Sequence, residues 1–208
     1  MSVTPLPVSP RHQVACPSGC AHRECDVELF KQAIQFLEAI ELVRLGGRAG
    51  LVRQLTRVEK KTVNRLYRQL HGTASPPGQA PFTDAWYIED DRRMLHATVV
   101  WRVDQRLCDA GRSDARRLID VYRSYRCIVG DPLLDLTRAA FVPRLVDMET
   151  WQPRVCEHCD AAYIASLVSP CTACPGCRLY HRYRCRHCQG PLNAKARGRP
   201  RRACGQCQ

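Results

Sequence analysis

Apolar residues in the first part of the chain recur every three or four positions, which is the spacing of an amphipathic helix. Phe30, Ile34 and Leu37 follow this spacing, and the pair Gly46-Gly47 supplies a stop signal. The pattern therefore predicts a helix over residues 26–45.

Two more helical segments follow, separated by a short turn. We expect a helix over 48–55, a turn over 56–58 and a third helix over 59–70, which stops before Gly72. The third helix has an apolar side and a basic, amide-bearing side. The apolar side is formed by Val63, Leu66, Tyr67 and Leu70, and the polar side by Lys60, Lys61, Asn64, Arg65, Arg68 and Gln69.

Residues 48–70 match a helix-turn-helix unit, in which the second of two helices is presented to DNA. Cations on such a helix can contact phosphates, and Asn64, Arg65 and Gln69 are of the types that read base edges. An ordinary amphipathic helix with a solvated basic face gives the same pattern, so both interpretations remain open. Glu59 stands where Ser or Thr would cap the helix better.

The remaining helices are predicted from their caps and breaks. Residues 74–81 form a Pro-rich linker, and helices are expected over 84–108 and 113–127 and from 131 to about 143, with continuation to 148 left open.

Ser113 and Asp131 are the expected N-caps of the last two helices, and Pro132 occupies a first helical position. The isolated Cys108 and Cys127 are interpreted as small buried apolar residues.

Charge and composition narrow the class of protein. Among 208 residues, 32 Lys and Arg stand against 20 Asp and Glu, which gives a formal net charge of +12. No stretch approaches the roughly 18 uninterrupted apolar residues of a membrane span, and the first 30 residues lack the apolar core of a signal peptide. We therefore expect a folded, cytoplasmic protein.

Cysteine is over-represented, with 14 residues, nine of them in the last 53. In a reducing compartment, clustered Cys-x-x-Cys pairs favour metal ligation over disulfides, because two thiolates on one tight turn can bind the same ion. The spacing predicts two structural zinc sites, with Cys171 an alternative to Cys177 in the first. Site 1 comprises Cys156, Cys159, Cys174 and Cys177, and site 2 comprises Cys185, Cys188, Cys204 and Cys207.

The segment between and beside these cysteines is strongly basic. Residues 161–208 contain no Asp or Glu, and nine Lys and Arg lie between positions 178 and 202. Such a segment is suited to phosphate contact rather than base reading. The residues expected to make these contacts include Arg178, Arg197, Arg199, Arg201 and Arg202.

Enzyme chemistry is not indicated by any motif. Phosphate-binding glycine loops and a nucleophile elbow are absent, and a zinc ion with four thiolates keeps no open position for a substrate. Residues 1–26 are expected to form a flexible arm, because they contain several prolines and few large apolar residues. Its Cys16, Cys20 and Cys25 are interpreted as exposed thiols in preference to metal ligands.

Four segments between Ile34 and Leu179 carry a family resemblance. They are IQFLEAIELVRLGGRAGLVRQLT, NRLYRQLHGTASPPGQAPFTDAWY, DPLLDLTRAAFVPRLV, and CEHCDAAYIAS followed by CPGCRL. The most specific combines a basic helix ending in RLYRQLHG, a Pro-rich loop and PF-x-x-x-W. Together they resemble the FlhC family, subunits of the bacterial flagellar transcriptional activator.

The resemblance implies a mostly helical fold, hetero-oligomerisation with FlhD and activation of flagellar operons through RNA polymerase. It also implies a four-cysteine zinc site formed by Cys156, Cys159, Cys174 and Cys177. A need for a partner is also suggested by apolar positions spread over long helices. They include Trp86, Trp101, Leu118, Tyr122 and Phe141.

The expected architecture is mainly α, with a helical domain over 27–150 that contains the helix-turn-helix-like segment 48–70. A small zinc-ribbon-like region over 151–208 follows. The favoured function is a non-enzymatic, DNA-binding transcriptional activator of the FlhC type, with zinc, double-stranded DNA, an FlhD-like subunit and RNA polymerase as partners. The alternative is a zinc-dependent protein-assembly module that binds nucleic acid without sequence choice.

Overall fold

The computed structural model describes residues 27–77, 81–108, 111–182, 184–192, 203, 204, 206 and 207. The arm predicted over 1–26 lies outside these residues. The elements in chain order are α1 (Val27–Arg44), α2 (Ala49–Thr56), α3 (Lys60–His71), α4 (Ala85–Ile88), α5 (Asp91–Arg106), α6 (Asp114–Val129), α7 (Leu136–Asp147), β1 (Trp151–Val155), β2 (Ala162–Ser166) and α8 (Pro175–Arg182). The expectation of a mainly helical fold is confirmed.

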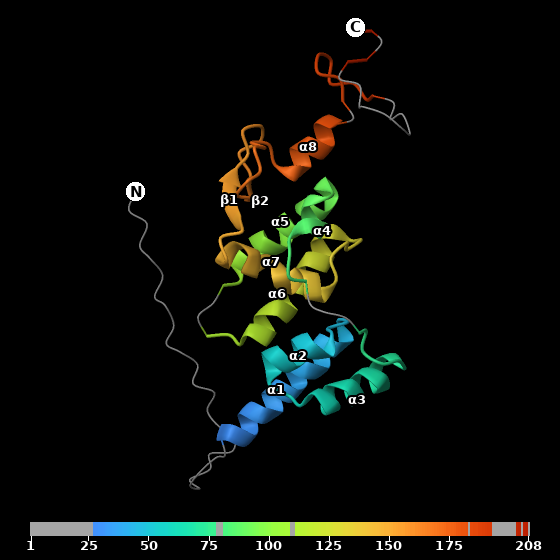
Figure 1. Cartoon of the computed structure of the whole chain (residues 1–208), viewed down its shortest axis with the longest axis vertical. Helices are drawn as coiled ribbons and strands as arrows, with labels where there is room; N and C mark the ends of the chain where they lie inside the picture. The colour runs from blue at the N-terminus through green and yellow to red at the C-terminus, as the bar shows by residue number, and fades with distance from the viewer. Residues whose placement is uncertain are drawn as a thin grey trace, which may run out of the picture.

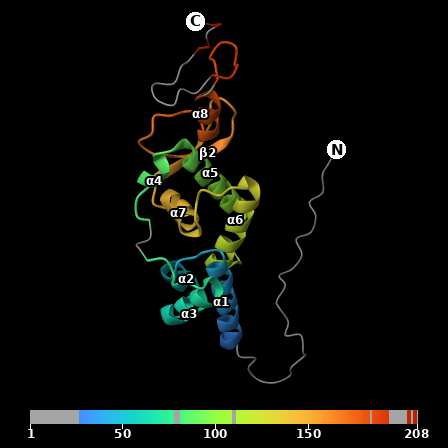
Figure 2. The same cartoon turned by 90° about the vertical axis from the view of Figure 1, so that its right-hand side faces the viewer.

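The elements are stacked in three tiers along the long axis of the molecule (Figures 1 and 2). The first tier contains α1, α2 and α3, and the second contains α4 to α7. The third contains α8 and the hairpin in which β1 pairs antiparallel with β2. Contacts of α6 with α1 and α2 join the first two tiers, and contacts of α5 with β2 and α8 join the last two.

The turn between α1 and α2 depends on two glycines. Gly46 has φ +84°, a left-handed conformation that favours glycine. At Gly47, an added Cβ would lie 2.7 Å from the carbonyl oxygen of Leu42, closer than real Cβ atoms approach. These residues bring α2 back along α1, so that α3 can pack against both helices.

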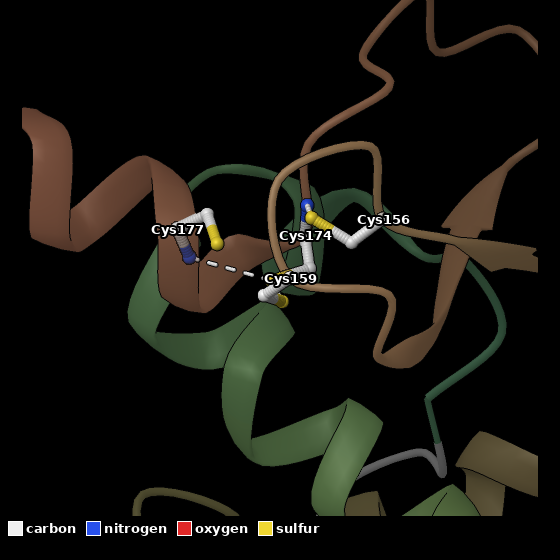
Figure 3. A group of neighbouring side chains, drawn as sticks. All are labelled: Cys156, Cys159, Cys174 and Cys177. Atoms are coloured by element: carbon white, nitrogen blue, oxygen red, sulfur yellow. Dashed lines mark hydrogen bonds between the residues drawn. The ribbon is translucent and has the colours of Figure 1, made fainter.

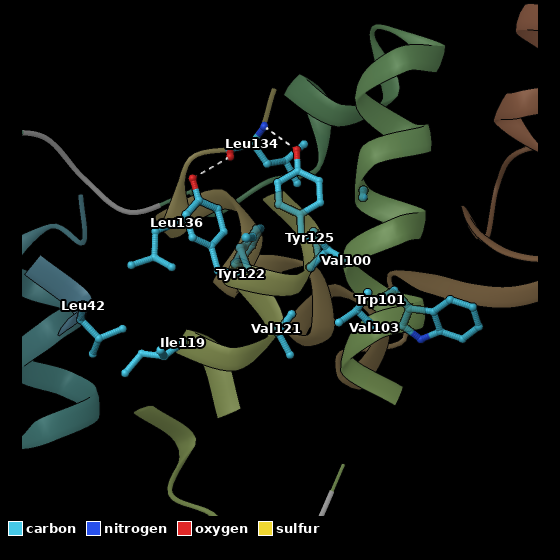
Figure 4. Close-up of a cluster of buried hydrophobic side chains, with 14 of the residues drawn as sticks. Leu42, Val100, Trp101, Val103, Ile119, Val121, Tyr122, Tyr125, Leu134 and Leu136 are labelled. Atoms are coloured by element: carbon cyan, nitrogen blue, oxygen red, sulfur yellow. Dashed lines mark hydrogen bonds between the residues drawn. The ribbon is translucent and has the colours of Figure 1, made fainter. Parts of the chain in front are cut away.

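The core is centred on α5, whose Met94, Ala97, Val100, Trp101 and Val103 are buried. Side chains from α6 and from the segment before α7 complete it, as the close-up in Figure 4 shows. Two tyrosines of α6 satisfy the backbone of Leu134 there. Its N–H donates to the Tyr125 hydroxyl at 3.1 Å, and its carbonyl accepts from the Tyr122 hydroxyl at 3.2 Å.

The prediction of a single helix over 84–108 is wrong in one respect, because this segment forms two helices, α4 and α5. Asp90 leaves the helical conformation and caps α5, its side chain accepting from the N–H of Arg92 at 2.9 Å. The predicted start of the last helix before the hairpin was also wrong. The last helix of the body begins at Leu136 with Asp135 as N-cap, not at Pro132 with Asp131 as N-cap. It continues through Pro143 to Asp147.

The interpretation of Cys108 and Cys127 as buried residues is wrong, since both are exposed. Cys108 lies beyond the end of α5, and Cys127 stands on the outer side of the last turns of α6. The large apolar residues expected to need a partner are placed differently as well. Trp101, Tyr122 and Phe141 are buried in the core, and Trp86 and Leu118 pack against it.

No helix in the described part of the chain is long and apolar enough to cross a membrane.

A buried carboxylate joins α5 to α6. The Asp104 side chain is 5% exposed and accepts from Nε of Arg117 at 2.7 Å, in a two-pronged ion pair. Removing one partner of a fully buried pair costs roughly 3–5 kcal/mol, because a buried charge is left without compensation.

We predict that Arg117→Ala lowers the free energy of unfolding by about 2–3 kcal/mol. The loss is below the full range because Arg117 is 32% exposed, so water can reach the site. Arg102→Ala, on the exposed side of α5, is the control and should change stability by less than about 0.5 kcal/mol. Urea unfolding followed by circular dichroism measures both, and equal stabilities would contradict the prediction.

Candidate metal centres and nucleic-acid surface

The first group of cysteines comes from the hairpin and from α8. Cys156 directly follows β1, Cys159 lies on the turn before β2, and Cys174 and Cys177 flank the first residues of α8. Their Sγ atoms all lie within 4.8 Å of one another. Figure 3 shows the four side chains converging, with Cys177 approaching from α8. We call these four residues the first cluster.

The spacing of the sulfur atoms suits a tetrahedral ion. Two thiolates each about 2.3 Å from one Zn²⁺ at tetrahedral angles are about 3.8 Å apart. The Sγ atoms of Cys159 and Cys174 lie 3.7 Å apart. The first cluster can therefore hold a metal ion.

Backbone N–H groups point at the sulfur atoms. Cys156 Sγ accepts from the N–H of Cys174 at 3.2 Å and of His158 at 3.4 Å. Burial alone would raise the pKa of the Cys156 thiol, but these N–H groups and that of Cys159 outweigh burial and lower this pKa to about 6. Cys156 is thus prepared as a thiolate, the form that binds metals.

The first cluster is fixed to the helical body through α8. Pro175 occupies the first position of α8, and Cys174 Sγ accepts from the N–H of Cys177 at 3.3 Å, as an N-cap side chain would. Arg178 Nε then donates to Asp91 at the start of α5 at 2.8 Å. Arg178 was expected to contact phosphate, but its guanidinium lies against this carboxylate.

The hairpin is held from its other end by Trp151, which is 1% exposed. Its indole Nε1 donates to the Asp84 carboxylate at 2.9 Å.

Cys171, the alternative ligand, is not part of the first cluster. Its carbonyl oxygen accepts from the Tyr163 hydroxyl at 3.0 Å and from Arg154 Nη1 at 3.2 Å. The segment that carries Cys171 is therefore anchored by its backbone, and the wider pairing with Cys177 is the one found.

A second group of four cysteines gathers near the C-terminus. The Sγ atoms of Cys185, Cys188, Cys204 and Cys207 also lie within 4.8 Å of one another, so this group can hold a metal ion too. We call it the second cluster.

The α2–α3 unit presents the basic face that the sequence suggested. Lys60, Lys61, Arg65 and Arg68 are exposed, and in the described part of the chain none of them pairs with a carboxylate. Val63, Leu66 and Tyr67 are buried on the opposite side, whereas Leu70 is 38% exposed. Glu59 precedes α3 without a side-chain capping bond.

Two hydrogen bonds fix this unit on its neighbours. The His71 ring Nε2 lies 2.7 Å from the carbonyl oxygen of Val43 in α1. Ser75 Oγ accepts from the N–H of Ala49 at 3.0 Å, which links the segment after α3 to the start of α2. The C-terminal end of α3 and the segment after it are thus linked to α1 and to α2.

Asn64 differs from the other polar residues of α3, because it is half-buried and lines a cavity of about 490 Å³. Lys60, Gln54 and Arg144 also line this cavity. The sequence analysis did not place Arg144 beside α3, because Arg144 belongs to α7, far along the chain. Arg197, Arg199, Arg201 and Arg202 lie outside the described residues.

Comparison with known proteins identifies the family of the chain. The family model described as flagellar transcriptional activator (FlhC) matches residues 26–203. The chain therefore belongs to the FlhC family, which consists of transcriptional regulators and is not a family of enzymes. Cys204 and Cys207 lie beyond the matched residues.

Relatives named flagellar transcriptional regulator FlhC are similar over most of their length. The one from Serratia marcescens is 29% identical over 81% of this chain and 85% of the relative. The one from Xenorhabdus nematophila is 28% identical over 80% of this chain and 84% of the relative. The one from Paraburkholderia atlantica is 27% identical over 78% of this chain and 73% of the relative.

We predict that Cys156→Ser abolishes metal binding at the first cluster and unfolds at least the hairpin and α8. Metal binding supplies folding free energy in such small modules, on the order of 10 kcal/mol. Cys171→Ser is the control, because only the backbone of Cys171 is used in the structure. Metal content and limited proteolysis after residue 150 report the two effects; a protease-resistant, metal-loaded Cys156→Ser protein would refute the prediction.

Proposed function

We propose that this chain is the DNA-binding subunit of a hetero-oligomeric transcriptional activator, which acts with an FlhD-like subunit at flagellar or related promoters and through RNA polymerase. The observation that carries the DNA-binding part is the exposed basic face of α3. It lies on the second helix of a helix-turn-helix-like unit, where DNA-reading side chains are presented.

The spacing along α3 supports a division of roles. Lys61, Arg65 and Arg68 stand at positions i, i+4 and i+7, so they lie on one side of the helix. Arg65, at the centre of this row, is suited to bidentate contact with a base edge, whereas lysines suit phosphates. Asn64 is also assigned to base reading, and it lines the same cavity as Lys60.

The C-terminal basic segment is assigned to phosphate contact. Arg197, Arg199, Arg201 and Arg202 follow one another closely with no acidic residue among them. Such contacts strengthen binding to any sequence and fall steeply with salt. Arg178 is left out of this assignment, because its guanidinium is paired with the Asp91 carboxylate.

Zn²⁺ is the metal that we propose for the first cluster. Four thiolates at tetrahedral spacing are its usual structural ligand set, and they leave no open position for a reacting group. Its role is therefore to hold α8 and the hairpin together.

The surface proposed for the FlhD-like subunit is the N-terminal half of α1. Leu29, Phe30, Ile34, Phe36 and Leu37 are between 40% and 64% exposed there. This end of α1 extends past α2 and α3 (Figure 2). Several exposed large apolar residues close together on one helix of a charged protein are typical of a protein interface.

We predict different DNA-binding defects for the two basic surfaces. Arg65→Ala or Asn64→Ala should lower discrimination between cognate and random DNA by about 1–3 kcal/mol, because hydrogen bonds to base edges are removed. Arg199→Ala combined with Arg201→Ala should weaken both DNAs equally and reduce the salt slope by about 1 for each phosphate that is no longer bound. Fluorescence anisotropy over a range of salt concentrations, with DNA selected from a random pool, measures both effects.

Two results would count against this assignment. If Arg65→Ala and Asn64→Ala keep specificity while changes near the clusters remove it, the reading surface lies in the metal-binding region. If the wild-type protein treats all sequences alike, the alternative function as a zinc-dependent assembly module with non-specific binding is favoured.

We predict that the chain alone self-associates and that co-expression with FlhD yields a well-dispersed complex. The double variant Phe30→Ser and Leu37→Ser should lose co-purification with FlhD, because it removes apolar contact area from α1. Phe82→Ser is the matched control, since Phe82 is 74% exposed but does not lie on α1. Light scattering and co-purification are the measurements; a stable monomer in the absence of FlhD would argue against the proposal.

A further inference from the structure

The two clusters share a local sequence pattern. CEHCD over residues 156–160 recurs as CRHCQ over residues 185–189, and a later Cys-x-x-Cys pair completes each cluster. The proposed function assigns a metal only to the first cluster, so the second calls for its own explanation.

The repeat extends to the backbone. In each segment, the residue after the second cysteine donates its N–H to the carbonyl of the first cysteine. The distance is 2.9 Å from Asp160 to Cys156 and 3.0 Å from Gln189 to Cys185. Asp160 and Gln189 also share a left-handed conformation, with φ of 55° and 58°. Because this conformation is uncommon outside glycine, the coincidence indicates that both segments form the same turn.

The sulfur atoms are surrounded in the same way. Cys185 Sγ accepts from the N–H of His187 at 3.5 Å and of Cys204 at 3.3 Å. These two bonds correspond to the two bonds made to Cys156 Sγ in the first cluster. The Sγ atoms of Cys188 and Cys204 lie 3.6 Å apart, far beyond the roughly 2.05 Å of a disulfide and close to the separation of two ligands of one tetrahedral zinc ion.

We propose that Cys185, Cys188, Cys204 and Cys207 form a second zinc site, independent of the first and closed by four thiolates. A zinc ion with four thiolates carries a formal charge of −2. The surrounding sequence can balance it, because residues 161–208 lack Asp and Glu and Arg184 and Arg186 flank the first ligand.

The surroundings of the two sites differ, and this difference sets how tightly each holds its metal. The first cluster packs into an apolar group with Tyr163, Ala165 and Ala173. Of the second cluster only Cys185 is buried, and among the described residues no buried apolar group forms around it.

The second cluster is joined to α8 by Arg184, whose guanidinium lies 4.2 Å from the centre of the Tyr180 ring.

Because an apolar shell restricts access to a metal, and the second cluster lacks the apolar group that surrounds the first, the second site exchanges its zinc faster than the first.

Zinc content tests the proposal in the full-length, reduced protein. Wild type should contain about two zinc ions per chain, and Cys204→Ser combined with Cys207→Ser about one. Cys108→Ser combined with Cys127→Ser is the matched control, because both cysteines are exposed and outside either cluster. Its zinc content should equal that of wild type, and all three proteins should keep the same helical circular dichroism.

The rate of zinc transfer to a chromogenic chelator tests the order of release. We expect a fast and a slow phase in wild type, with the fast phase missing from the Cys204→Ser and Cys207→Ser variant. If wild type contains only one zinc ion and the Cys204→Ser and Cys207→Ser variant still contains one, the second site is overturned. A Cys185–Cys188 disulfide detected by mass spectrometry would overturn it as well. Two zinc ions released in one phase would overturn the order of release. None of these results affects the assignment of base reading, which depends on α3.

Discussion

Burial of α5 is the constraint on which the other elements depend. This helix contacts α4, α6, α7, α8 and β2, and most of its apolar side chains are buried. A carboxylate near each end receives an arginine from another element, with Asp91 bound to Arg178 and Asp104 to Arg117. The position of α5 therefore also determines where the first cluster lies, because α8 packs against α5 and Arg178 of α8 pairs with Asp91.

Features governed by neighbouring residues could be predicted from the sequence. The helix limits around Gly46 and Ser113 follow from backbone conformation and capping, which act within one turn. The grouping of cysteines into two sets of four follows from the reach of a tight turn, and the structure brings together the same eight residues. The basic face of α3 could be located for the same reason, since helical periodicity alone separates it from Val63 and Leu66.

Features that depend on distant contacts could not be predicted. Arg178 binds a carboxylate 87 residues away, so its sequence neighbourhood suggested only a free cation. Asp90 was also taken as an interior helix residue, although its cap on α5 is a local contact, because the helical pattern continues across the break between α4 and α5. Dependence on distant contacts also explains why Cys108 and Cys127 were placed in the core: their residue type favours burial, but their position on the outer side of the bundle does not.

The contact between α8 and α5 makes the first cluster sensitive to conditions that never touch a sulfur atom. Cys174 and Cys177 flank the start of α8, and Arg178, the next residue, forms the ion pair with Asp91. If metal binding stabilises the contact of α8 with α5, then any change that stabilises this contact must increase the affinity for the metal by the same factor. Both side chains of this pair are only about a quarter exposed, so salt screens it weakly, and ionic strength therefore has a small effect on metal affinity through a helix–helix contact.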